Sequence, residues 1–530
     1  MPPPSSRPTV RAFTVRGERR SALAAETMAS LVMAVVLGAI APLRAVRADE
    51  LPEDTNTIES LTPEQARNMA ATQGVLLEYR TAEGNRVTGR GLALRSLKSL
   101  DAAVAEELAG YEFGAALLLD GLATLSDEAA KALARYKGHL SLDGLTALSP
   151  AVAQALAACE ADLSLDGLTT LSDEAAEALA RHKRGLSLDG LTTLSDEAAR
   201  ALARHKGDLS LDGLTALSPA AAQAIASCDG NLSLGGLTML SDETAETLAL
   251  HRTKGKILSL NGLTTLSETG AQALARYPGN WLRINGLTTL SAGTARALLQ
   301  RRGRTQFLGG LTRLDVETAR VLAAAANWDG RLPSITALDS EDSVEIAAAL
   351  AARKGFLWLP KLTTISPQAL RALFGESDPV NPADTPPELP ANAARAPVLA
   401  AQGGGLQRQN VVFIGGLTRL DVETARVLAA AEKWDGRLPS LTAFDSVDSV
   451  AIAQALATRK GPLLLPKLKH ISPRTLSALI VKQDVEIPLV ETLEFIAEPD
   501  GGPTEDFVIP DWLQQRQKQR AASGLIRPPQ

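Results

Sequence analysis

Five aspartates recur at a constant interval and could together bind a metal ion. Each stands directly before a glycine, 23 residues after the one before it: Asp120, Asp143, Asp166, Asp189 and Asp212. If each repeat adds one strand to a parallel sheet, neighbouring carboxylates lie about 4.8 Å apart. Carboxylate oxygens bind Ca²⁺ at about 2.3–2.6 Å, but Asp-Gly is also a common composition for a turn. We expect solvent-exposed turns here, with a calcium site as the alternative.

A second column places potential zinc ligands at one position of the repeat. Its members are Tyr136, Cys159, His182, His205, Cys228, His251 and Tyr277. Zinc ligands lie about 2.0–2.3 Å from the metal, whereas Cys159 and Cys228 are three repeats, or roughly 14 Å, apart. That separation excludes one tetrahedral site and also a disulfide, for which the Cα atoms lie within about 7 Å. We expect free thiols, no metal and polar helix ends that suit the helix dipole, with a loose His182–His205 pair as the alternative.

A third column lies between the two leucines of each strand, where a side chain would point outward. It is serine in the first repeats, at Ser141, Ser164, Ser187, Ser210, Ser233 and Ser259. Further on it changes to larger residues, at Arg283, Phe307, Arg331, Trp358, Phe413 and Arg437. Arginine and aromatic side chains contribute most of the binding energy in many interfaces. These six residues are therefore the predicted binding site, unless the linker or the irregular repeats cover them.

The repeating unit predicts the elements that position these columns. From Leu186, LSLDGLTTLSDEAARALARHKGD alternates leucine with polar residues and then changes to a helical pattern. Leu186 and Leu188 would point inward and Ser187 outward, as alternate residues of a strand do. Ser195 is a preferred helix N-cap, and Asp196 adds negative charge to the first turn. One unit cannot bury its own leucines, so the units must stack, and strand–helix–strand connections are right-handed.

The unit resembles the leucine-rich repeat, in particular its cysteine-containing subclass with leucine at the cysteine position. The matching residues are Leu163, Leu165, Leu168, Leu171, Ser172 and Asp173. The resemblance extends from about Leu92 to Leu493 and implies an α/β fold, a right-handed leucine-rich-repeat-like solenoid of short parallel strands and helices. Because leucine replaces the family's Asn or Cys, its side-chain ladder would be missing. The unit also lacks the first leucine of the usual motif, so we expect short strands and a flatter stack.

The chain divides into six predicted segments. Residues 1–48 read as a signal peptide, since arginines precede an apolar run from Met28 and small residues end it at Ala48. An uncleaved membrane anchor is the alternative. A capping region (49–91), a repeat solenoid (92–374), a Pro/Ala/Gly-rich linker or insertion (375–409), a second repeat block (410–499) and a polar tail (500–530) follow. GGLTRLDVETARVLAAA recurs at an offset of 106 residues, which indicates a segmental duplication.

Composition and motifs limit the function. The 530 residues carry a net charge of −6 without a long basic run, which argues against nucleic acid as a partner. No nucleophile elbow, phosphate-binding loop or HExxH pair is present, so we expect neither an enzyme nor a cofactor.

The predicted function is a non-catalytic, exported repeat scaffold, at the periplasm or cell surface. It would bind another protein or a surface polysaccharide through its strand face, and would touch a membrane only if the signal is uncleaved. A structural spacer of the cell envelope, without a specific ligand, is the alternative.

Overall fold

The computed structural model describes residues 54–71, 74–81, 86–112, 116–250, 256–375, 411–502 and 508–522. They form two compact units. The N-terminal unit comprises the described residues within Arg47–Trp328, together with Leu332–Ser334, and the C-terminal unit comprises Asp329–Arg331 and those from Ile335 onward. The predicted signal peptide, and the predicted linker except Gly375, lie outside the described residues. Within the described ranges, no helix has the length and apolar character needed to cross a membrane.

The N-terminal unit contains an 11-stranded sheet in which the strands follow chain order. Strand β1 (Val75–Arg80) is antiparallel to β2 (Arg86–Ala93), and each later strand is parallel to the one before it. The later strands are β3 (Ala116–Leu118), β4 (His139–Ser141), β5 (Asp162–Ser164), β6 (Leu186–Ser187), β7 (Leu209–Ser210), β8 (Leu232–Ser233), β9 (Ile257–Ser259), β10 (Trp281–Arg283) and β11 (Arg304–Gln306). This alternation of parallel strands and helices is the predicted α/β repeat solenoid.

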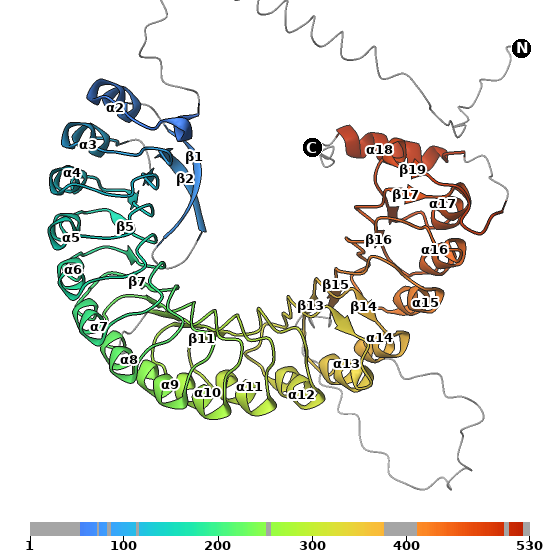
Figure 1. The fold of residues 1–530 in the computed structure, drawn as a ribbon. Coiled ribbons are helices and arrows are strands. Elements are labelled where there is room, and N and C mark those ends of the chain that lie inside the picture. The colour runs from blue at the N-terminus through green and yellow to red at the C-terminus, as the bar shows by residue number, and fades with distance from the viewer. Residues whose placement is uncertain are drawn as a thin grey trace, which may run out of the picture. The chain divides into compact units, whose positions relative to one another are not determined.

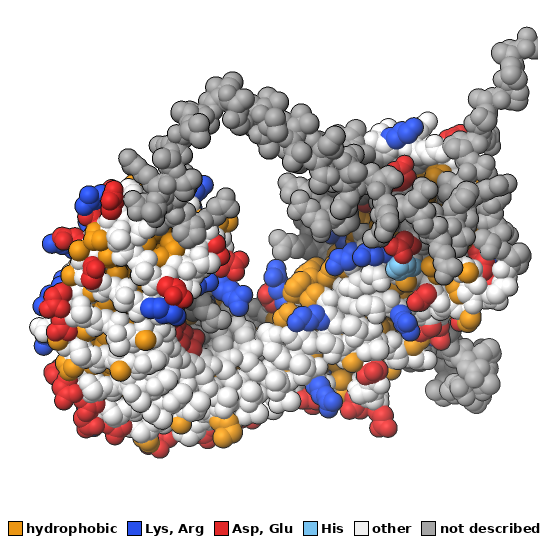
Figure 2. Space-filling model, turned by 45° about the horizontal axis from the view of Figure 1, so that its top comes forward, with side chains coloured by type: hydrophobic (Ala, Val, Ile, Leu, Met, Phe, Trp, Pro, Cys, Tyr) orange, Lys and Arg blue, Asp and Glu red, His pale blue; other side chains and the backbone are white. Residues whose placement is uncertain are grey.

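Short helices cover one side of this sheet (Figure 1). They are η1 (Thr55–Thr57), α2 (Pro63–Ala70), α3 (Ala102–Ala109), α4 (Asp127–Leu133), α5 (Pro150–Ala157), α6 (Asp173–Leu179), α7 (Asp196–Leu202), α8 (Pro219–Ile225), α9 (Asp242–Ala249), α10 (Glu268–Ala275), α11 (Ala292–Leu299) and α12 (Val316–Ala324). Acidic residues occupy the first turn of several of them. Figure 2 shows acidic side chains along the outer side of this unit. Those in the first helical turns complement the positive helix N-termini.

The local sequence explains the regularity of each repeat. Leu186 and Leu188 are fully buried, as predicted, and Leu186 pairs in register with Leu209. The hydroxyl of Ser195 accepts a hydrogen bond from the backbone N–H of Ala198 at 3.0 Å, which caps α7. The glycine after each strand has a packing role, because a Cβ atom at Gly190 would overlap the carbonyl oxygen of Asp166 in the preceding repeat.

The C-terminal unit continues the alternation with less regular strands. Four two-stranded parallel sheets pair β12 (Ala337–Leu338) with β14 (Thr364–Ile365), β13 (Leu357–Leu359) with β15 (Val412–Ile414), β16 (Leu463–Leu464) with β18 (Val485–Glu486), and β17 (His470–Ile471) with β19 (Glu494–Phe495). The helices are α13 (Ser343–Ala351), α14 (Pro367–Phe374), α15 (Val422–Ala430), α16 (Ser449–Ala457), α17 (Pro473–Leu479), η2 (Val490–Thr492) and α18 (Asp511–Ala522). Since β13 pairs directly with β15, the residues on the two sides of the predicted linker belong to one stack.

The duplicated WDGRLPS segments explain why the strand pairing is interrupted here. Gly330 and Gly436 adopt positive φ values of 80° and 79°, which other residues rarely tolerate. The turn at each glycine leaves only isolated bridges to the following strand, from Arg331 to Trp358 and from Arg437 to Leu464. These bridges keep the column of larger side chains in register from one repeat to the next.

Candidate functional site

A ladder of aspartate side chains runs along the N-terminal unit, just beyond the strands. The Oδ1 atom of Asp143 accepts hydrogen bonds from Ser164 Oγ at 2.6 Å and from the backbone N–H of Asp166 at 3.0 Å. The same pair of bonds recurs at Asp166, Asp189 and Asp212. Each carboxylate therefore joins its own repeat to the next through a side chain and the backbone.

This ladder corrects three expectations. The aspartates are half-buried rather than solvent-exposed turn residues. The serines are buried rather than solvent-exposed, and those from Ser141 to Ser233 each donate a hydrogen bond to the aspartate of the preceding repeat. A side-chain ladder, which was expected to be missing, is also present and is formed by aspartates. Among the described residues, no group of three potential ligands is arranged to hold a metal ion.

Burial affects the pKa of some aspartates of the ladder. It raises the pKa of Asp166, and it raises the pKa of Asp189 to about 6, with the charge of Asp166 adding to the effect. Desolvation disfavours the charged form of a carboxyl group, and neighbouring carboxylates increase this cost.

The column of His and Cys residues is buried between the repeats. Cys159 and Cys228 are free thiols, as predicted. The Cys159 thiol donates a hydrogen bond to the carbonyl oxygen of Tyr136, with a distance of 3.4 Å from Sγ to the oxygen. The rings of His182 and His205 stack in parallel, with centroids 6.0 Å apart. Burial lowers the pKa of His182 to about 4, so the expectation of a polar helix end suited to the dipole is wrong for this residue. His251 lies outside the described residues.

The predicted binding residues fall in both units. Arg283 is half-buried on β10 in the N-terminal unit, and in the C-terminal unit Arg331 and Arg437 are exposed. Phe307 is 4% exposed and belongs to the core, so its assignment to the outward column is wrong. Gln306 pairs with Arg283 and occupies that position. One additional residue between β11 and the following glycine turn shifts Phe307 to the inward side.

Three of the predicted residues meet in the C-terminal unit. Trp358 and Phe413 are half-buried neighbours on β13 and β15, with ring centroids 6.2 Å apart and planes inclined by 21°. The Arg331 guanidinium lies 5.4 Å from the centroid of the Trp358 ring. Arg331 also forms an ion pair with Asp329 at 3.6 Å. We call Arg331, Trp358 and Phe413 the aromatic stack.

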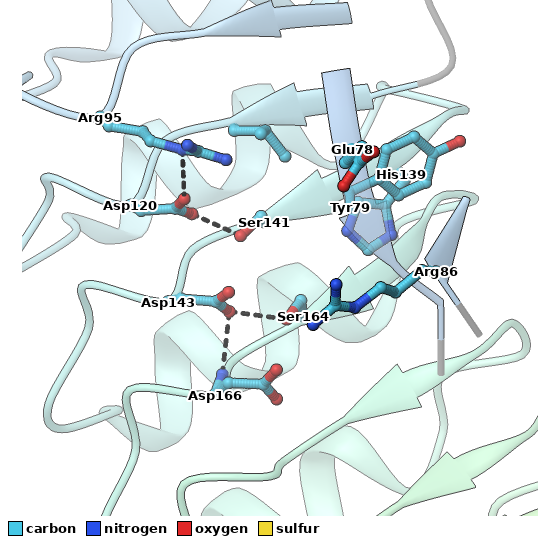
Figure 3. A pocket seen from close by; sticks show the side chains of 11 residues that line it. Glu78, Tyr79, Arg86, Arg95, Asp120, His139, Ser141, Asp143, Ser164 and Asp166 are labelled. Carbon is cyan, nitrogen blue, oxygen red and sulfur yellow. Dashed lines mark hydrogen bonds and ion pairs between the residues drawn. The ribbon is translucent and has the colours of Figure 1, made fainter. Parts of the chain in front are cut away.

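Sequence reasoning missed a cavity beneath the N-terminal hairpin. The cavity has a volume of about 290 Å³. Glu78, Tyr79 and Arg86 of the β1–β2 hairpin line one side together with His139, and Asp143 and Asp166 line the other (Figure 3). The Tyr79 ring stacks on His139 at 4.7 Å, which holds the hairpin over the strands. The only signal for this arrangement is the alternation in VLLEYR, which places Leu77 and Tyr79 on one face of β1.

Comparison with known proteins gives no functional assignment. No protein-family model matches the chain, and no curated protein matches it in sequence. Among solved structures, it is similar to the leucine-rich repeat-containing protein LegL7 from Legionella pneumophila, with 18% identity, a TM-score of 0.29, and coverage of 45% of this chain and 91% of that chain. It is also similar to a chain of the yeast Rad7 and Elc1 complex, with 13% identity, a TM-score of 0.25, and coverage of 63% and 80%. The solenoid assignment rests on the strand register itself.

Proposed function

We propose that this protein is a non-catalytic, exported scaffold that binds another protein through the strand face of its C-terminal unit. The aromatic stack carries the proposal. Trp358 and Phe413 are large apolar side chains that remain partly exposed on adjacent strands, where a purely structural face would have small polar ones. Aromatic and arginine side chains held rigidly by their neighbours lose little entropy on binding.

The geometry of the stack favours a protein over a polysaccharide. A sugar ring packs on the open face of an aromatic ring, but both faces of Trp358 are occupied, by Arg331 at 5.4 Å and by Phe413 at 6.2 Å. The centroid spacing of 6.2 Å is also less than twice the carbon–carbon contact distance of about 3.5–4.0 Å, so no further ring fits between Trp358 and Phe413. The stack therefore presents ring edges and a guanidinium, which suit a protein surface.

A comparison of three variants tests the proposal. Proteins captured from a native envelope extract by the full chain would be identified, and the affinity of each candidate would be measured. Trp358→Ala should weaken true binding by roughly 10-fold or more. Val481→Ala, at a side chain that is 78% exposed outside the stack, should leave the affinity unchanged.

A third variant separates binding from folding. Leu359→Ala, at a fully buried neighbour of Trp358 on β13, should cost about 2–5 kcal/mol of stability. Trp358→Ala should cost much less. Equal loss of stability in these two variants would show that Trp358 serves packing. If Trp358→Ala leaves the affinity for every captured protein unchanged, the alternative of a structural spacer is favoured.

Export is a separate part of the proposal, supported by the basic and apolar pattern before Ala48. N-terminal sequencing of the native protein should begin at Asp49. Retention of Met1 in a cytoplasmic fraction would contradict export.

A further inference from the structure

The cavity beneath the N-terminal hairpin combines charge with an apolar wall. Four carboxylates, from Glu78, Asp120, Asp143 and Asp166, face two guanidinium groups. One of these, from Arg95, is already paired with Asp120 at 3.3 Å. Leu118 and Tyr79 add apolar surface.

Two carboxylates remain available for a ligand. Both ladder bonds of Asp143 are accepted by Oδ1, and those of Asp166 also use Oδ1. Neither second oxygen accepts one of these ladder bonds, and both carboxylates point toward the space below Tyr79 and Arg86 (Figure 3). The two residues are one repeat apart, so the carboxylates are separated by about 4.8 Å.

His139 is an independent indication of a ligand. The side chain is 6% exposed, lines the cavity, and its Nδ1 atom has no hydrogen-bond partner among the described residues. A buried polar atom without a partner costs about 1–3 kcal/mol, and a ligand that donates a hydrogen bond to it would recover part of this cost. Burial lowers the pKa of His139, so at neutral pH the ring is uncharged and one of its nitrogens can accept a hydrogen bond.

We propose that this cavity binds a short linear alkyl diamine, with one ammonium group between Asp143 and His139 and the other at Asp166. The two ammonium groups balance the excess of two negative charges in the cavity. The alkyl chain lies against Leu118 and Tyr79. Metal ions fit less well, because the described residues offer no group of three ligands around one point. A free amino acid fits less well too, since its carboxylate would lie among the aspartates.

Titration calorimetry of the full chain with putrescine, at low ionic strength and pH 8, tests this proposal. Binding should be saturable with one putrescine per chain, and butylamine, which has a single ammonium group, should bind at least 10-fold more weakly. Asp143→Asn and Asp166→Asn should each weaken putrescine binding by roughly 10-fold or more, as expected for a lost charged hydrogen bond. The ladder tolerates asparagine, because Asn261 accepts from the backbone N–H of Asn285 at the same position.

Asp212→Asn is the matched control. Asp212 makes the same two ladder bonds but does not line the cavity, so its substitution should change putrescine affinity by less than 2-fold. Glu78→Gln changes an exposed hairpin residue outside the ladder, and should weaken binding without affecting folding. Absence of putrescine binding would overturn the proposal. So would equal weakening by Asp212→Asn and Asp143→Asn, equal affinity for butylamine, or binding of Ca²⁺ in place of putrescine.

Discussion

The Oγ atom of Ser187 donates a hydrogen bond of 2.6 Å to the Oδ1 atom of Asp166, although the two residues are 21 positions apart. The same Oδ1 atom accepts from the backbone N–H of Asp189 at 2.9 Å. A single carboxylate oxygen thus satisfies a buried hydroxyl and a backbone donor of the next repeat. This relationship explains how a stack with two-residue strands keeps its register.

Removal of the hydroxyl should therefore weaken the stack at one joint. Ser187→Ala takes away one of the two donors to Asp166 and should lower stability by about 1.5–3 kcal/mol, the range for hydrogen bonds to charged groups. Asp166→Ala should cost more, because it leaves both the Ser187 hydroxyl and the Asp189 N–H without their acceptor. The denaturant midpoint of unfolding measures both effects.

Thr169→Ala, at an exposed residue of the same repeat, is the control and should leave the midpoint unchanged. A Ser187→Ala midpoint equal to that of the control would show that the ladder contributes nothing to stability.

The charge of the ladder should make stability depend on pH in a defined direction. Burial raises the pKa of Asp189 to about 6, above its ordinary value of 3.8. The folded state then binds more protons than the unfolded state between these two values, so this contribution falls as pH rises toward 6. Asp189→Asn removes the charge, and should be more stable relative to the wild type at pH 8 than at pH 4. Urea unfolding at both pH values measures the difference.

Glu160→Gln provides a control for that comparison, since Glu160 is exposed and does not belong to the ladder. Its stability relative to the wild type should be similar at both pH values. An Asp189→Asn variant that gains no stability at pH 8 would contradict the assigned cost of burying this charge.

The fold should protect the two thiols from alkylation. Cys159 and Cys228 are both buried, and burial raises the pKa of Cys228 to about 12. Because the thiolate is the reactive form, alkylation of the folded protein at pH 8 should be slow. Denaturation should then expose two reactive thiols per chain, counted by mass spectrometry after alkylation. Detection of a Cys159–Cys228 disulfide in the native protein would contradict the spacing of the repeats.

The elements of the fold were predictable because they depend on local pattern. The inward leucines such as Leu188 and the N-cap Ser195 follow from alternation and from capping preference, and both are confirmed. The ladder was not predictable in this way. The pattern Ser-Leu-Asp-Gly places serine and aspartate on one face of a strand, but gives no indication that Ser187 bonds to the aspartate of the previous repeat.

The residues of the candidate site were also only partly predictable from the repeat pattern. Trp358 and Phe413 could be aligned by counting from the repeated glycine, since β13 and β15 keep their register. The same count failed at Phe307, where one additional residue precedes the turn. The cavity involves Tyr79, from a hairpin outside the repeat, so no periodicity relates it to His139.

The buried histidine pair should make the protein sensitive to acid. Burial, together with the nearby His205, lowers the pKa of His182 from 6.5 to about 4, so the folded state binds fewer protons than the unfolded state between these values. The stability due to the neutral ring is present above pH 6.5 and is lost as pH falls toward 4, by an amount on the order of 3 kcal/mol. His182→Cys places at this position the residue that Cys159 supplies one repeat earlier, and should remove most of this pH dependence. Urea unfolding at pH 7 and pH 4.5 measures it in both proteins. If the wild type and His182→Cys lose the same stability between these pH values, the assignment of acid sensitivity to His182 is wrong.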